Sequence, residues 1–287
     1  MKEAAVLPML LKQLRLPTMS RLWKEMNTEA VEQGWTPTRY LKALCEHELS
    51  DRDNRKLARY MAESQLPRGK TLETFDFRAI PSLNKSRITA FASGDVWIKS
   101  GKNLLIFGPS GVGKTHLAAA IGEKLVEAGY RVLFSRTTEV VQKLQVAKRE
   151  CNLVSALEKL NKYDCLILDD MGYVQKDQTE TSVLFELISE RYENKSLLIT
   201  CNQTFDEWDK IFMDKAMTIA AVDRLVHHAT ILELNVESYR KRAALKATKL
   251  QKEEVEQNQR ASSLTSAAGN ADPASDVLEE EANQAHV

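Results

Sequence analysis

The sequence has no excess of charge of either sign. Its 287 residues include 40 Lys and Arg and 40 Asp and Glu, so the formal net charge at neutral pH is zero. A strongly basic chain would attract nucleic acid over its whole surface, whereas here any such surface must be local. With 43% hydrophobic and 28% charged residues the chain can bury a core, which excludes disorder throughout.

Cysteine pairs and long apolar runs are also lacking. The four cysteines form no C-x-x-C pair, so neither a disulfide framework nor a zinc site is indicated. The histidines His116, His227 and His228 have no nucleophile or metal ligand at an informative spacing. The apolar runs are far shorter than a membrane span, and the N-terminus does not resemble a secretory leader. We expect a cytoplasmic protein with no membrane partner.

The first 63 residues show apolar side chains at helical spacing, which predicts three helices in a small all-helical domain. Thr18 and Thr36 are the expected helix starts, because a threonine hydroxyl can accept a hydrogen bond from a free amide at a helix N-terminus. Basic side chains gather at the end of this region: Arg52, Arg55, Lys56, Arg59, Arg68 and Lys70. They are either a solvated helical face or a surface that binds DNA or a partner.

Residues 64–82 contain two prolines and a glycine and show no period, which is typical of a linker. Over residues 83–242, short apolar runs alternate with helical patterns. The alternation predicts an α/β domain with a parallel five-stranded sheet, whose strands we place at residues 104–107, 131–134, 165–168, 197–200 and 230–234. Helices are expected at residues 114–128, 138–160 and 179–192. Residues 243–287 form an extension, acidic and disordered from about residue 261.

A phosphate-binding loop follows the first of these strands and precedes a helix. It reads G-x-x-x-x-G-K-T and consists of Gly108, Pro109, Ser110, Gly111, Val112, Gly113, Lys114 and Thr115. In such loops the backbone amides surround phosphate oxygens, the lysine reaches the β- and γ-phosphates, and the Ser/Thr hydroxyl ligates Mg²⁺. The pattern in this context predicts binding of ATP with Mg²⁺.

Two carboxylates lie at the end of an expected buried strand, about 55 residues after the phosphate loop. Asp169 is the expected second ligand of Mg²⁺, and Asp170 the residue that polarises the attacking water. A pair of aspartates can also be a simple strand end. Asn202 ends the next apolar strand, where it can hold the same water, although a lone Asn in this position is ordinarily a turn residue.

The motifs together resemble the IstB-like transposition helper proteins, which are ATPases of the AAA+ class and relatives of the DnaC-type helicase loaders. The resemblance extends to about residue 242. Apart from the phosphate loop, it rests on the runs TLETFDF, LDDMGY, LISERY, TCNQTFDEW and DRLVHH at residues 71–77, 168–173, 187–192, 200–208 and 223–228.

The resemblance implies roles for further residues. Asn202 becomes the sensor of the γ-phosphate, and Arg224 the arginine finger that acts on ATP bound by a neighbouring copy, which implies a homo-oligomer. A surface ion pair with Asp223 is the alternative for Arg224. The family usually has a glycine before its final Ser-Tyr-Arg; here it is missing before Ser238, and whether Arg240 serves as a second sensor stays open.

The segment 138–160 resembles the inserted helices with which related proteins grip DNA, and it carries Lys143, Lys148 and Arg149, with Lys159 and Lys162 at its end. The expected function is therefore an ATPase that oligomerises on double-stranded DNA and recruits or stimulates a cognate transposase. A replicative helicase loader of the DnaC type is the alternative. A small-molecule kinase fits less well, because no substrate lid is apparent.

Overall fold

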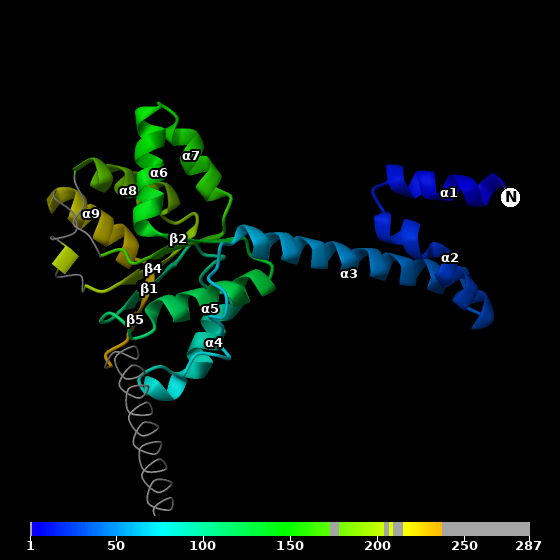
Figure 1. Ribbon diagram of the computed structural model, residues 1–287, viewed down its shortest axis with the longest axis horizontal. Coiled ribbons are helices and arrows are strands. Elements are labelled where there is room, and N and C mark those ends of the chain that lie inside the picture. The colour runs from blue at the N-terminus through cyan, green and yellow to red at the C-terminus, as the bar shows by residue number, and fades with distance from the viewer. Residues whose placement is uncertain (1, 173–177, 204–206, 209–214, 237–287) are drawn as a thin grey trace, which may run out of the picture. The chain divides into compact units, whose positions relative to one another are not determined.

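Five short strands form a single parallel sheet in the computed structural model of the chain, which describes residues 2–172, 178–203, 207–208 and 215–236. The strands are β1 (Asn103–Phe107), β2 (Val132–Arg136), β3 (Cys165–Asp169), β4 (Ser196–Cys201) and β5 (Ala229–Glu233). Their order is β2-β3-β4-β1-β5, so β1 lies between β4 and β5 (Figure 1). The predicted parallel five-stranded sheet is confirmed, with strand bounds within two residues of those expected.

Helices cover both faces of the sheet, because successive side chains of each strand point to opposite sides. Leu105 and Phe107 of β1 face one apolar cluster, whereas Leu104 and Ile106 face another. The first cluster is closed by α6 (Thr137–Arg149), α7 (Leu153–Asn161), α8 (Gln178–Arg191) and α9 (Lys215–Val226), and the second by α4 (Lys85–Ser93) and α5 (Lys114–Glu127). The two groups of helices lie on opposite sides of the sheet in Figure 1.

The three predicted N-terminal helices are present as α1 (Lys2–Gln13), α2 (Pro17–Glu32) and α3 (Pro37–Glu63). Thr36 caps α3 as expected, since its side chain accepts a hydrogen bond from the Arg39 amide. The expected role of Thr18 is wrong, because α2 begins one residue earlier, at Pro17. The Thr18 and Met19 amides instead donate to Oε2 of Glu48, a buried carboxylate of α3, at 2.7 and 3.1 Å.

Two further expectations need correction. Residues 138–160 are two helices rather than one, because α6 ends where Cys151 takes a left-handed φ of 54°. There the amides of Cys151 and Asn152 donate back to the carbonyls of Lys148 and Ala147. The segment 64–82, expected to be a linker, packs against the domain: its side chains Phe75 and Ile80 are buried in the apolar cluster that contains residues of α4 and α5. The sequence did not predict α4.

Two buried polar side chains fasten helix ends to the sheet. Asn103 Nδ2 donates to the carbonyl of Leu225 in α9 at 3.1 Å, and the amide of Leu197 in β4 donates to Asn103 Oδ1 at 3.0 Å. Arg191, at the end of α8, donates to backbone carbonyls before β3 and in β4, including that of Ser196 at 2.8 Å. Burial lowers the pKa of Arg191 to about 10.

In the described part of the chain, no helix combines the length and the apolar character that crossing a bilayer requires. The expected C-terminal extension (residues 243–287) and Arg240 lie outside the described residues.

Candidate functional site

The phosphate loop joins β1 to α5 and needs glycine at its ends. Gly108 has a φ of 150°, and a Cβ added there would lie 2.5 Å from the carbonyl oxygen of Leu234. Gly113 has a φ of 105° and directly precedes α5, with the Phe75 ring 3.3 Å from the place of a Cβ. Only glycine fits both positions without strain. The loop thus presents its backbone amides at a helix N-terminus, which suits an anion.

Lys114 is buried at the first position of α5, with 5% of its surface exposed. Its Nζ donates to the carbonyl oxygens of Gly108 and Pro109 at 2.8 and 2.9 Å and to Oδ1 of Asn202. A buried ammonium needs such partners, because an unpaired charge away from water is costly. The contacts bring the lysine of the loop together with the polar residue that follows β4, a pairing that the sequence did not predict.

Asp169 ends β3 and is buried, with 4% of its surface exposed. Its Oδ1 accepts hydrogen bonds from Thr115 Oγ1 at 3.0 Å and from Thr200 Oγ1 at 2.6 Å. Burial raises the pKa of Asp169, although the bond from Thr200 lowers it in part. The residues expected at a divalent cation, Thr115 and Asp169, are therefore in direct contact. Their hydroxyl and carboxylate oxygens are donors that suit Mg²⁺.

Asp170 is the first residue after β3 and has a φ of 56°, a left-handed conformation that is unusual for a residue with a side chain. Its amide donates to Thr200 Oγ1 at 3.0 Å. Asn202 is the first residue after β4, the strand that pairs with β3. The two residues expected to handle the attacking water therefore flank adjacent strand ends.

Thr200 is the residue that the sequence reasoning missed. It is fully buried in β4, donates to Asp169 and accepts from the amide of Asp170, so one hydroxyl orients both residues. A signal was present: Thr200 is a polar residue that follows the apolar run 197–199 and precedes Asn202 by two residues, which places both on one face.

Arg224 lies on α9 and makes its contacts away from the phosphate loop. Its guanidinium lies over the Phe185 ring of α8, 4.9 Å from the ring centroid, and donates to the Ala220 carbonyl at 3.2 Å. The side chain is half-buried. Within one copy of the chain, Arg224 is therefore held by α8 and α9.

The basic residues of α3 fall into two groups. Arg52 and Arg55 pair with the buried carboxylate of Glu48, with N–O distances of 3.5 and 3.4 Å. Both residues thus neutralise the side chain that also holds the start of α2. Lys56 and Arg59 are exposed on the same helix. Because Lys56 and Arg59 do not belong to the ion pairs with Glu48, they are the better candidates for a contact with DNA phosphates.

The basic residues of α6 divide in the same way. Lys148 pairs with Glu186 of α8 at 2.9 Å and so helps to hold the two helices together. Lys143 and Arg149 are exposed on α6. A helix that presents free cations to solvent can contact phosphates without reading bases.

Comparisons with known proteins agree with the fold and with ATP binding. The chain is 58% identical over 245 residues to an insertion sequence ATP-binding protein of Sinorhizobium fredii, covering 85% of this chain and 82% of that protein. It is 35% identical over 246 residues to the ATP-binding protein of insertion sequence IS21 from Pseudomonas aeruginosa, covering 86% and 92%.

Among solved structures, AMPPCP-bound DnaA from Aquifex aeolicus matches with a TM-score of 0.50 at 19% identity, covering 60% of this chain and 51% of that one. At this identity the likeness concerns the fold alone, which is that of the AAA+ ATPases. Residues 9–247 match the family described as IstB-like ATP binding protein. The resemblance stated from the motifs is thereby confirmed, and this chain belongs to the IstB-like ATP-binding proteins of insertion sequences.

Proposed function

We propose that the protein is an ATPase that assembles on double-stranded DNA and there recruits or stimulates a cognate transposase. The observation that carries the ATPase part is the convergence of Lys114, Thr115, Asp169 and Asn202 at the ends of β1, β3 and β4. Membership in a family of insertion-sequence proteins supports the role in transposition. We expect the protein to act in the cytoplasm.

ATP binding begins with an exchange of partners at Lys114. The ammonium group gives up its hydrogen bonds to the carbonyls of Gly108 and Pro109 and to the side-chain oxygen of Asn202. It donates to phosphate oxygens instead. The exchange is favourable because hydrogen bonds between charged partners are about twice as strong as neutral ones. The loop amides at the start of α5 bind the remaining phosphate oxygens.

Thr115 and Asp169 hold Mg²⁺, which neutralises charge on the phosphates when bound. Asp170 accepts the proton of the attacking water, and Asn202, released from Lys114, orients that water and contacts the γ-phosphate. Thr200 fixes the backbone of Asp170 and the carboxylate of Asp169 in their relative positions. The residues of one chain thus bind ATP and activate the water.

Arg224 completes the site of a neighbouring copy. Its present contacts, an aromatic face and one backbone carbonyl, can be exchanged for the two charged oxygens of a phosphate, because hydrogen bonds between charged partners are stronger than neutral ones. A guanidinium placed at a γ-phosphate in trans stabilises the charge of the transition state. Hydrolysis therefore depends on a homo-oligomer.

The exposed cations of α3 and α6 supply the contacts with DNA. Lys56, Arg59, Lys143 and Arg149 carry charge that the ion pairs with Glu48 and Glu186 do not use. Phosphate contacts of this kind give binding that weakens steeply with salt and depends little on sequence.

The chemistry is tested with Asp170→Asn, which should bind ATP with wild-type affinity but hydrolyse it about 100-fold more slowly or worse. Asp53→Asn, at an exposed position of α3, is the matched control. Hydrolysis at the wild-type rate in Asp170→Asn would remove Asp170 from its proposed role.

The DNA role is tested by measuring affinity for duplex and single-stranded DNA, with and without ATP, over a range of salt. Changing Lys56 and Arg59 together to Gln should reduce the salt slope on duplex DNA by about 0.9 for each phosphate that is no longer neutralised. Changing Lys85 and Arg87 of α4, both exposed, is the control. An ATP-dependent preference for single strands would instead favour a helicase loader.

A further inference from the structure

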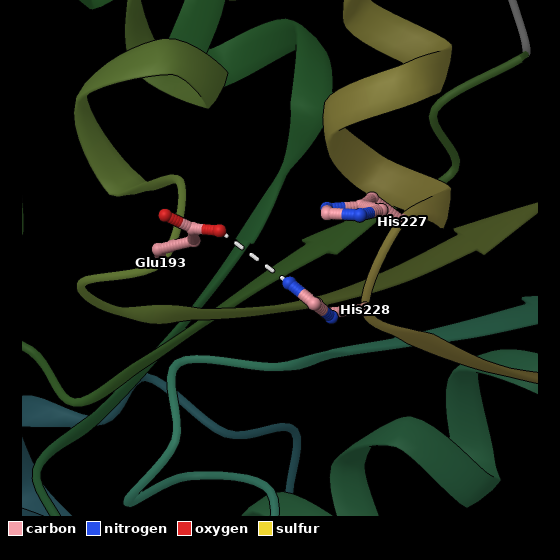
Figure 2. A group of neighbouring side chains, drawn as sticks. All are labelled: Glu193, His227 and His228. Carbon is pink, nitrogen blue, oxygen red and sulfur yellow. Dashed lines mark ion pairs between the residues drawn. The ribbon is translucent and has the colours of Figure 1, made fainter.

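Three metal-binding side chains meet at a place that the phosphate site does not use. His227 and His228 form the turn between α9 and β5, and Glu193 lies in the turn between α8 and β4. Their ligand atoms all lie within 4.8 Å of one another, and His228 Nε2 is 3.4 Å from Glu193 Oε1. Figure 2 shows the carboxylate and the two imidazoles directed toward one space. Sequence spacing did not reveal this group, because Glu193 precedes the histidines by more than thirty residues.

The backbone on both sides of the group is fixed. Around Glu193, whose φ is 57°, the amides of Asn194 and Lys195 donate to the Arg191 carbonyl at 3.1 and 2.9 Å. On the other side, the carbonyl of His228 accepts from the Asn103 amide at 3.2 Å. Two backbone segments are thus held opposite each other, which lowers the entropy lost when their side chains take a common ligand.

Tyr192 provides the outer hydrogen bond that metal-binding histidines commonly have. Its hydroxyl lies 2.7 Å from Nδ1 of His227. When Nδ1 carries the proton and donates to this hydroxyl, the lone pair of Nε2 is free for a metal ion.

We propose that Glu193, His227 and His228 bind one divalent transition-metal ion of the Zn²⁺ type. Two imidazoles and one carboxylate are a donor set for such ions, whereas Mg²⁺ prefers oxygen ligands only. At Zn–N distances of about 2.0–2.1 Å the ligand atoms must approach to roughly 3.3 Å of one another. The side chains are exposed and can make this small movement. Solvent supplies the remaining coordination position.

The ion would link the turn between α9 and β5 to the turn between α8 and β4. His228 lies one helical turn beyond Arg224, and Glu193 precedes β4, which leads to Asn202. A metal bridge across these turns fixes the end of α9 against the start of β4. Its expected signature is a gain in stability that depends on the free metal concentration.

The test uses the full chain without a histidine tag, freed of metal with a chelator and kept reduced with a phosphine. Titration with Zn²⁺ alone should show one saturable site per chain. At a free Zn²⁺ concentration of roughly 100 times Kd, the melting temperature should rise by about 5–10 °C. His228→Ala and Glu193→Gln should lose this rise while melting like the wild type without metal.

Tyr192→Phe distinguishes a preorganised metal site from chance binding by surface side chains, because it removes only the outer hydrogen bond to His227. It should weaken Zn²⁺ binding by about 10- to 100-fold. His47→Ala and Cys151→Ser change exposed groups elsewhere and should bind like the wild type. Binding that survives His228→Ala, or that disappears in either control instead, overturns the proposal, as does the absence of any saturable site in the wild type.

Discussion

Lys114 and Asn202, 88 residues apart in the chain, are joined by a hydrogen bond from the lysine ammonium to the amide oxygen. While this bond is present, the lysine ammonium and the asparagine side chain each satisfy the other, and neither contacts a phosphate. An anion that draws the lysine away also frees the asparagine. Under the proposed mechanism, loading of the nucleotide and release of the sensor are one event.

The lysine can be removed to test this link. Lys114→Ala should weaken ATP binding by at least about 100-fold, because the phosphates lose charged hydrogen bonds of about 1.5–3 kcal/mol each. Lys42→Ala, an exposed lysine of α3, should leave the affinity unchanged. Calorimetric titration with a non-hydrolysable ATP analogue measures both. Undiminished affinity in Lys114→Ala would place the nucleotide elsewhere.

Thr200→Val keeps the shape of the side chain but removes the hydroxyl that orients the two aspartates. The free energy of unfolding should fall by about 1–3 kcal/mol, because a buried carboxylate and a backbone amide each lose a partner. ATP hydrolysis should fall more than ATP binding. Thr230→Val in β5 is the control, and urea unfolding with steady-state hydrolysis is the measurement. Equal effects in both variants would show that Thr200 has no special role.

The buried carboxylate of Asp169 makes stability depend on pH. Since burial raises its pKa, the folded protein keeps this proton to higher pH than the unfolded chain does. Between the ordinary pKa and the raised one, stability therefore falls as pH increases, and above the raised pKa the full cost is present.

Asp169→Asn cannot ionise and should raise the urea midpoint at neutral pH while it abolishes hydrolysis. The gain should shrink toward zero as pH falls to about 4, near the ordinary pKa of an aspartate. Asp53→Asn should show no pH-dependent difference from the wild type. An Asp169→Asn protein that is less stable than the wild type at pH 7 would mean that Thr115 and Thr200 favour the charged form more than burial opposes it.

Arg224→Ala should bind ATP normally but hydrolyse it roughly 1000-fold more slowly, because the neighbouring γ-phosphate loses its cation. Mixing this variant with Lys114→Ala subunits should restore activity, since the latter still carry Arg224. In an equal mixture, roughly one interface in four joins an intact phosphate loop to an intact Arg224. This fraction is the upper limit of the hydrolysis that mixing can restore. No rescue at any mixing ratio would argue against a site shared between copies.

Local patterns were sufficient to predict the core of the fold. The central strands β1, β3 and β4 are buried throughout and mostly apolar, because both faces of the sheet are covered there. The glycines of the phosphate loop are required by backbone geometry at Gly108 and Gly113. The match of these elements to the structure is close. The roles of Asp170, Asn202 and Arg224 remain predictions.

The features that were missed depend on contacts between distant residues. The start of α2 is held by Glu48, thirty residues away from Thr18, so a local capping rule could not find it. The break between α6 and α7 follows from one left-handed residue, Cys151, for which the sequence offers no glycine signal. Thr200 acquires its role only when β3 and β4 lie side by side.

The amide of Asn103 holds the end of α9 with its nitrogen and the start of β4 with its oxygen. Neither element can slide past β1 without leaving a buried polar group unpaired, which costs about 1–3 kcal/mol. Under the proposed function, a displacement imposed on Arg224 by a neighbouring copy would therefore be passed on to β4, the strand that directly precedes Asn202. The side chain of Asn103 would then couple the helix that carries Arg224 to the strand that leads to the nucleotide pocket.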